Sequence, residues 1–271
     1  MKTVIEKQSK TALITGASSG LGLQFAHIFA RDGYNVVLVA RGVDKLNALK
    51  DEVEKDYGIK AYVFGCDLSE KDSAQKVYDY TKENGIDISV LVNNAGFGDF
   101  GEFSERDWEK QYNMISVNVT TLAQLTRLYL PHFLEKNDGR ILNVASIAAF
   151  EPGPLMSVYY ASKAFVLSFT EALAVEIKKS KVKVCALCPG PTGTGFEDAA
   201  SAKASGLFKN LKVARADKVA LFGYKKLMKG RVVVIPGLSN KILPFAVRFA
   251  PRCMVRNLVY KVMRARRARK D

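Results

Sequence analysis

A tyrosine and a lysine four residues apart are the side chains in this sequence whose types and spacing could carry out proton transfer. Tyr159 and Lys163 lie in a stretch of helical periodicity, where residues four apart share one face. A free phenol has a pKa of about 10, and an adjacent ammonium lowers it by favouring the phenolate. Ser146, at the end of a predicted strand, can donate a hydrogen bond to a developing oxyanion. Together these groups could interconvert a carbonyl and an alcohol, with Tyr159 as proton donor and acceptor.

A glycine-rich turn gives this pair its context, because the same spacing also occurs on ordinary amphipathic helices. Gly16, Gly20 and Gly22 directly follow the first predicted strand and lead into an amphipathic helix. Glycine at these positions permits a tight turn and close approach of the main chain to a pyrophosphate, while the helix N-terminus offers free N–H groups. The sequence therefore predicts a dinucleotide site.

The end of the second predicted strand indicates which dinucleotide is preferred. NAD sites usually place an acidic residue there, but this chain has Arg41, and its next acidic residue is Asp44. The planar guanidinium of Arg41 could bind a 2′-phosphate, with Ser18 as a second hydrogen-bonding partner. We expect NADP(H) as the cofactor, although Arg41 could also be an ordinary surface arginine.

Short β-branched segments alternate with helical patterns along the first 240 residues. The predicted strands are residues 11–14, 36–39, 61–64, 88–92, 140–144, 182–187 and 232–235. They are apolar on both faces, and segments such as 21–31 and 44–57 between them have helical length and periodicity. This alternation predicts an α/β fold of Rossmann type: a doubly wound parallel sheet of about seven strands with helices on both faces, in one catalytic domain over residues 1–240.

Four motifs in this order resemble the short-chain dehydrogenase/reductase family. They are residues 15–22, Asn93-Asn94-Ala95-Gly96, Ser146 followed by Tyr159-Tyr160-Ala161-Ser162-Lys163, and Pro189-Gly190. The resemblance covers residues 10 to about 195. It implies that Asn118, Ser146, Tyr159 and Lys163 are catalytic, with Asn118 holding a water in a proton relay past the lysine.

The resemblance also implies the residues that contact the cofactor. Asp67 would lie at the adenine, Asn94 beside the adenosine ribose, Pro189 and Gly190 at the nicotinamide, and Thr192 and Thr194 at the carboxamide and phosphate. The full expected set is Gly16, Ser18, Ser19, Gly20, Leu21, Gly22, Arg41, Asp67, Leu68, Asn94, Ala95, Gly96, Tyr159, Lys163, Pro189, Gly190, Thr192 and Thr194.

The substrate is less clearly specified than the reaction. Residues 191–213 are rich in small residues and follow a strand end, so we expect a lid over the site. The expected pocket walls are apolar: Phe97, Phe100, Phe103, Phe150, Pro152, Met156, Phe196, Leu207 and Phe208. They favour a hydrophobic ketone or secondary alcohol, such as a steroid, in the manner of the family's hydroxysteroid dehydrogenases. A 3-oxoacyl or other carbonyl reductase is the alternative within the family, and a non-catalytic NADP-binding sensor is the alternative outside it.

Cysteine usage and apolar runs narrow the remaining classes. Only Cys185 and Cys188 form a C-x-x-C pair, and in the predicted strand they point to opposite faces, so with two histidines in the chain we expect no metal site. No uncharged apolar stretch approaches the length of a spanning helix, and residues 1–7 have no apolar signal region. The expected location is cytoplasmic, and the expected assembly is a homodimer or homotetramer.

Most of the excess positive charge lies in a C-terminal extension, residues 241–271. It holds ten Lys and Arg residues and one acidic residue, in a chain of net charge +14. Met254, Val255, Leu258, Val259, Val262 and Met263 recur there at helical spacing. Such a basic amphipathic helix could pack on its own domain or on a second subunit, which we favour, or make a peripheral membrane contact. A nucleic-acid partner is not expected, because from Arg252 onward the basic residues are interleaved with no stacking aromatic beyond Tyr260.

Overall fold

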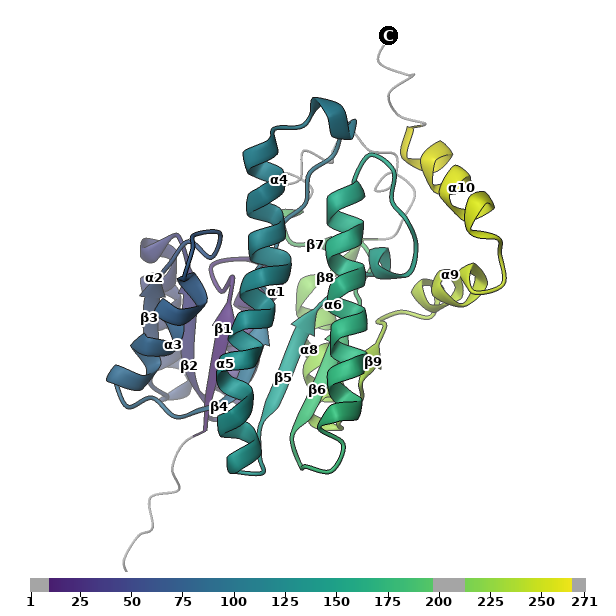
Figure 1. The fold of residues 1–271 in the computed structure, drawn as a ribbon. Helices are drawn as coiled ribbons and strands as arrows, with labels where there is room; N and C mark the ends of the chain where they lie inside the picture. The colour runs from purple at the N-terminus through teal and green to yellow at the C-terminus, as the bar shows by residue number, and fades with distance from the viewer. Residues whose placement is uncertain (1–9, 197–212, 265–271) are drawn as a thin grey trace, which may run out of the picture.

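Helices cover both faces of a single seven-stranded parallel sheet (Figure 1). The computed structural model describes residues 10–196 and 213–264. The strand order is β3-β2-β1-β4-β5-β6-β9. The strands of this sheet are β1 (Thr11–Thr15), β2 (Asn35–Ala40), β3 (Ala61–Gly65), β4 (Ile88–Asn93), β5 (Arg140–Val144), β6 (Lys183–Leu187) and β9 (Val233–Val234). The predicted doubly wound Rossmann-type sheet is confirmed, with all seven predicted strands in it.

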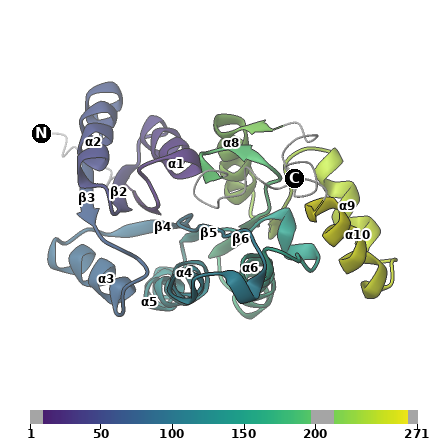
Figure 2. The ribbon, with the colours of Figure 1, turned by 90° about the horizontal axis from the view of Figure 1, so that it is seen from above.

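The helices form two layers, one on each face of the sheet (Figure 2). One layer consists of α1 (Gly20–Arg31), α2 (Val43–Tyr57) and α8 (Ala216–Met228). The other consists of α3 (Ser73–Glu83), α4 (Trp108–Ile115), α5 (Leu122–Glu135) and α6 (Ser157–Glu176). A π-helical turn over Ser116–Thr121 joins α4 to α5. The central strands are thus covered on both sides, which explains why β1 is buried along its whole length.

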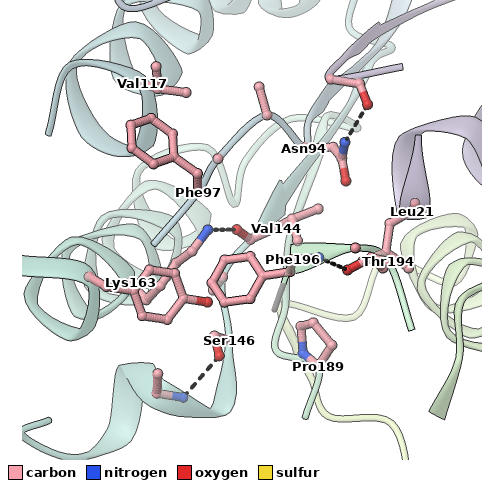
Figure 3. Close-up of a pocket in the computed structure, with 18 of the residues that line it drawn as sticks. Leu21, Asn94, Phe97, Val117, Val144, Ser146, Lys163, Pro189, Thr194 and Phe196 are labelled. Carbon is pink, nitrogen blue, oxygen red and sulfur yellow. Dashed lines mark hydrogen bonds between the residues drawn. The ribbon is translucent and has the colours of Figure 1, made fainter. Parts of the chain in front are cut away.

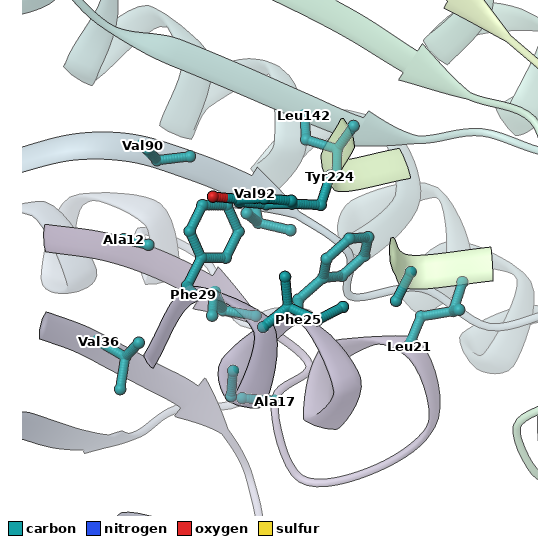
Figure 4. Close-up of a cluster of buried hydrophobic side chains, with 14 of the residues drawn as sticks. Ala12, Ala17, Leu21, Phe25, Phe29, Val36, Val90, Val92, Leu142 and Tyr224 are labelled. Carbon is teal, nitrogen blue, oxygen red and sulfur yellow. The ribbon is translucent and has the colours of Figure 1, made fainter. Parts of the chain in front are cut away.

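Each helical layer buries aromatic side chains against the sheet. Phe25 and Phe29 of α1 are fully buried, and the Phe29 ring meets the edge of Tyr224 from α8 at a centroid distance of 5.0 Å (Figure 4). On the opposite face of the sheet, the side chains of Tyr129 and Phe133 of α5 are at most 2% exposed. These two clusters fix a helical layer to each face of the sheet, and the expected site residues lie beyond the carboxyl ends of its strands.

The structure refines some predicted boundaries. β9 contains Val233 and Val234 alone, where residues 232–235 were predicted, because only these two pair with β6. A separate two-stranded sheet joins β7 (Thr192–Gly193) to β8 (Ala214–Arg215), the two ends of the predicted lid segment. Residues 197–212, which include Leu207 and Phe208, lie outside the described residues.

Two helices, α9 (Ser239–Val247) and α10 (Arg252–Arg264), follow β9 and lie together at one edge of the molecule (Figures 1 and 2). Met263 of α10 is fully buried in a cluster with Met156 and Tyr160, and Val259 packs against the same cluster. One face of α10 therefore packs on its own domain, but Met254 and Leu258, expected on that face, are 64% and 63% exposed. Over residues 10–196 and 213–264, no helix is long and apolar enough to cross a membrane.

Candidate active site

A cavity of about 950 Å³ opens at the carboxyl ends of the strands. Its wall contains 18 of the 20 residues that the sequence analysis assigned to catalysis or cofactor binding, and the exceptions are Gly22 and Asn118. The residues brought together are Gly16, Ser18, Ser19, Gly20, Leu21, Arg41, Asp67, Leu68, Asn94, Ala95, Gly96, Ser146, Tyr159, Lys163, Pro189, Gly190, Thr192 and Thr194. Figure 3 shows Lys163, Ser146, Phe196 and Pro189 around this space.

The glycine turn forms one end of the cavity and can accept a pyrophosphate. Gly16 and Gly20 have φ of 65° and 55°, the left-handed region that favours glycine. A Cβ atom on Gly22 would lie 2.1 Å from the Gly16 carbonyl oxygen, so Gly22 allows α1 to pack against the turn. Ser19 caps α1 without a side-chain hydrogen bond, which leaves N–H groups of the first turn free for an anion. This part of the chain therefore fits a dinucleotide.

Asn94, which follows β4, is hydrogen-bonded to the glycine turn. Its Nδ2 donates to the Thr15 carbonyl oxygen at 2.8 Å and to the Gly16 carbonyl oxygen at 3.3 Å. Thr194, from the beginning of the predicted lid, contacts the other side of the turn, since a Cβ atom on Gly20 would lie 2.8 Å from Thr194 Cβ. The turn is thus held between two loops that also line the cavity.

Arg41, Ser18 and Asp67 line the same cavity where β2 and β3 end. The Arg41 side chain is 81% exposed, and its Nη1 lies 3.9 Å from Asp67 Oδ2. Burial would raise the pKa of Asp67, but hydrogen bonds from Ser69 and the charge of Arg41 outweigh it and lower that pKa. Arg41 is therefore an exposed cation at the cavity rim with one long ion pair to Asp67.

Tyr159 and Lys163 of α6 and Ser146 after β5 meet in the middle of the cavity. Lys163 is 5% exposed, and its Nζ donates to the Val144 carbonyl oxygen at 2.8 Å. The same Nζ lies 5.8 Å from the centre of the Tyr159 ring. Ser146 Oγ accepts the Ala148 N–H at 3.1 Å, and the Ser146 side chain is also hydrogen-bonded to Tyr159.

Burial sets the proton affinities of this pair, and it acts on both residues. It raises the pKa of Tyr159 to about 12, and a side-chain hydrogen bond with Ser146 offsets only part of the effect. It lowers the pKa of Lys163 to about 8. We expect Lys163 and the positive oxidised nicotinamide together to lower the pKa of Tyr159. Among the protein's own groups, desolvation opposes the phenolate and outweighs the hydrogen bond with Ser146. Tyr159 is thus held as a phenol, the form that can donate a proton.

Asn118 lies behind the cavity wall, in the π-helical turn, and is fully buried. Its side chain accepts the Phe97 N–H at 3.1 Å and donates to the Phe97 carbonyl oxygen and to Ser162 Oγ, both at 3.0 Å. A Cβ atom on Gly96 would lie 2.9 Å from Asn118 Oδ1 and 3.4 Å from Lys163 Nζ. Asn118 therefore positions the loop beside Lys163, and a role in a water relay stays a prediction.

The apolar wall is smaller than expected. Phe97, Met156 and Phe196 line the cavity, and the Phe196 and Tyr159 rings lie 5.1 Å apart. Phe103, which was expected there, is 57% exposed on a 3₁₀ turn and is not among the described lining residues. Three more expected wall residues are absent from the described lining: Phe100 packs beside Met156, Phe150 packs under β6, and Pro152 is half-buried.

Sequence reasoning missed polar residues that the structure places in the cavity wall. Glu151 lines it, and burial raises the pKa of this carboxyl to about 7. Its Oε2 is buried, and the described residues offer it no hydrogen-bond partner. Asn240 of α9 also lines the cavity and lies so close to Gly190 that a Cβ atom there would be 2.7 Å from its Nδ2. No local sequence pattern identifies Asn240 as a cavity residue. Glu151 lies in sequence between the catalytic candidates Ser146 and Tyr159, and this position could have identified it.

Comparisons with known proteins agree with this geometry. A family model described as short chain dehydrogenase matches residues 10–205. The 17-beta-hydroxysteroid dehydrogenase type 3 of Mus musculus is 37% identical over 190 residues, covering 68% of this chain. The match spans only 61% of the relative's length.

Solved structures share the fold over most of the chain. A short-chain dehydrogenase from Sphingobium yanoikuyae in complex with NADPH superposes with a TM-score of 0.78 at 32% identity, covering 89% of this chain and 94% of that one. A short chain dehydrogenase/reductase from Burkholderia phymatum in complex with NAD gives 0.77 at 27% identity, covering 89% and 92%. Both nicotinamide dinucleotides thus occur among similar structures.

Proposed function

The chain belongs to the short-chain dehydrogenase family, and from this premise we propose that it is an NADP(H)-dependent oxidoreductase that interconverts a bulky hydrophobic ketone and its secondary alcohol. The observation that carries the proposal is the position of Tyr159. Its ring lies between Lys163 and the apolar side chain of Phe196, in a cavity whose other end is the glycine turn. The proton donor therefore lies between the glycine turn, which would bind the nucleotide, and the apolar part of the cavity, which would bind the substrate.

The residues of the chain supply the proton and the orientation, while the bound nicotinamide would supply the hydride. Tyr159, kept as a phenol by burial, donates its proton to the carbonyl oxygen as negative charge develops there. The Ser146 hydroxyl, which is hydrogen-bonded to Tyr159, can donate to the same oxygen and orient it. Lys163, whose pKa is close to 8, can return a proton to Tyr159 after each turnover. In the direction of oxidation the same groups act in reverse.

The proposed preference for NADP(H) rests on Arg41. Its side chain is exposed at the cavity rim, and no acidic residue follows β2 before Asp44, so the 2′-phosphate would meet a cation and no carboxylate acceptor stands ready for a ribose hydroxyl. Asp67, 3.9 Å from Arg41, is already paired with Ser69 through its Oδ1. Because a similar structure binds NAD, the assay must compare NADPH with NADH.

The proposed substrate class follows from the apolar half of the cavity. Phe97, Met156 and Phe196 offer contact area to a rigid hydrocarbon skeleton. A relative whose name is that of a hydroxysteroid dehydrogenase supports a steroid-like ketone. A 3-oxoacyl chain is the alternative, because a long acyl group would use the same wall.

An initial-rate screen tests the proposal. Purified chain would be assayed with NADPH and NADH against steroid ketones, 3-oxoacyl thioesters and a keto sugar, by the absorbance of the reduced cofactor. We expect turnover of a bulky apolar ketone with NADPH, little with the keto sugar, and a lower kcat/KM with NADH. NADPH binding without turnover of any carbonyl compound would instead support a cofactor sensor.

A further inference from the structure

Helix α9 presents a continuous apolar stripe to its surroundings. Leu238, Ile242, Phe245 and Phe249 recur at spacings of four, three and four residues and are 80%, 65%, 65% and 76% exposed. The opposite side of the helix is fixed to the domain: Pro244 is buried there, and Asn240 lines the cavity. Because this anchoring sets the rotation of α9, the stripe faces away from the rest of the protein.

Helix α10 extends the stripe. While Val255 and Met263 are buried, Met254, Leu258 and Val262 recur every four residues and are 64%, 63% and 47% exposed. Figures 1 and 2 both place α9 and α10 at the same edge of the molecule, so the two sets of exposed apolar side chains lie on neighbouring helices. We call the seven side chains the apolar stripe: Leu238, Ile242, Phe245, Phe249, Met254, Leu258 and Val262. An exposed apolar set of this size marks a contact site.

The charge around the stripe indicates what covers it. Between Asp217 and Asp271 the sequence contains no acidic residue. The two helices and their connection carry six exposed basic side chains, Lys241, Arg248, Arg252, Arg256, Lys261 and Arg264. A second copy of this surface would bring another six positive charges against these without a compensating acid, which opposes self-association about a two-fold axis. An anionic bilayer offers both an apolar interior for the stripe and negative headgroups for the rim.

We propose that the α9–α10 surface docks on anionic lipid bilayers, with the apolar stripe in the headgroup–acyl boundary and the basic residues at the phosphates. The proposal does not depend on the reaction assigned above. It does place the cavity close to the lipid, because Asn240 of α9 lines the cavity and Met263 of α10 packs against Met156 and Tyr160 of its wall. A substrate dissolved in a bilayer would then reach the site from the docked side.

Vesicle co-sedimentation of the full chain tests the docking. Vesicles of phosphatidylcholine with about a third phosphatidylserine are compared with pure phosphatidylcholine, at low and high salt. We expect binding to the anionic vesicles that weakens with salt. Phe245→Ser combined with Phe249→Ser should reduce partitioning by about tenfold or more, because each ring loses the apolar area it buries. Arg248→Gln combined with Arg252→Gln should reduce it by about fivefold per charge.

The matched control is Trp108→Ser combined with Val175→Ser. These side chains are 63% and 61% exposed, as in the tested pair, but lie beside Glu109 and Glu176 and away from α9 and α10. The control should bind vesicles as the unchanged chain does. Thermal melts of all variants exclude unfolding, which is not expected for side chains this exposed.

A depth measurement makes the orientation testable without removing the stripe. Cys253 is exposed and the other three cysteines are buried, so Cys253→Ser leaves no reactive thiol among them. In that background a fluorophore on Leu258→Cys should be quenched by lipids brominated on the acyl chains, whereas one on Asp51→Cys of α2 should not.

Three results would overturn the proposal. The intact chain could fail to bind anionic vesicles, or the Phe245/Phe249 variant could bind as well as the control, which would assign any binding to residues 265–271. Loss of a dimer in this variant, seen by light scattering with vesicle binding unchanged, would assign the surface to a second copy.

Discussion

Replacement of Arg41 by aspartate should shift the cofactor preference from NADPH towards NADH. Two unit charges about 4 Å apart attract by about 1 kcal/mol in water and about 4 kcal/mol at an effective dielectric constant of 20. Because the Arg41 side chain is 81% exposed, the lower figure applies. Arg41→Asp removes this attraction and adds a repulsion of similar size, so the discrimination changes by about 2 kcal/mol. The ratio of kcat/KM for NADPH to that for NADH should fall by roughly thirtyfold.

The fold should tolerate this substitution. The contact between Arg41 and Asp67 is 3.9 Å long and largely exposed, and such pairs contribute less than about 1 kcal/mol to stability. The assay measures initial rates with both cofactors at low and high salt, with Tm as a check. Arg31→Asp, at the end of α1, changes the net charge equally outside the cavity and should leave the ratio unchanged. An unaltered ratio in a folded Arg41→Asp protein would refute the assignment of the 2′-phosphate to Arg41.

Three further predictions concern other parts of the cavity. Tyr159→Phe should lower kcat by about 10² to 10⁴ with NADPH affinity retained, whereas Tyr160→Phe, whose ring packs on Gly153, should keep substantial activity; equal kcat values would place the proton donor elsewhere. Gly22→Ala should weaken NADPH binding by roughly tenfold or more in a fluorescence titration, because its Cβ would meet the Gly16 carbonyl oxygen at 2.1 Å, and unchanged affinity would argue against this turn as the pyrophosphate site. Burial raises the pKa of Glu151 from 4.5 to about 7, so the folded state holds the proton more tightly and its stability falls as pH rises through that window. Glu151→Gln should remove that loss in urea unfolding at pH values on either side of the window, and identical pH dependence in the two proteins would contradict the burial argument.

The parts of the site that the sequence could predict are those set by local spacing. Gly16, Gly20 and Gly22 mark a turn because they follow a strand and precede a helix, and Tyr159 and Lys163 share a face because helical geometry requires it. The order of apolar segments was similarly enough to predict a parallel sheet, since each was apolar on both faces.

Features that depend on distant parts of the chain could not be predicted in this way. Asn240 lies at the cavity only because α9 returns past Gly190. The direction of the pKa shift of Tyr159 depends on its burial, which a helical spacing does not report. For the same reason, the periodicity of α10 identified its apolar residues without showing that Met263 is buried while Leu258 is exposed.

Isotope transfer tests the central claim most directly. The chain would be incubated with NADPH carrying deuterium at the transferable position of nicotinamide C4 and with the best apolar ketone from the screen, and the alcohol would be analysed by mass spectrometry. We predict one deuterium in the product, bound to the carbinol carbon, with the yield collapsing in Tyr159→Phe while NADPH binding persists. Persistent NADPH binding with no deuterated alcohol from any ketone, or equal yield from Tyr159→Phe, would contradict the account.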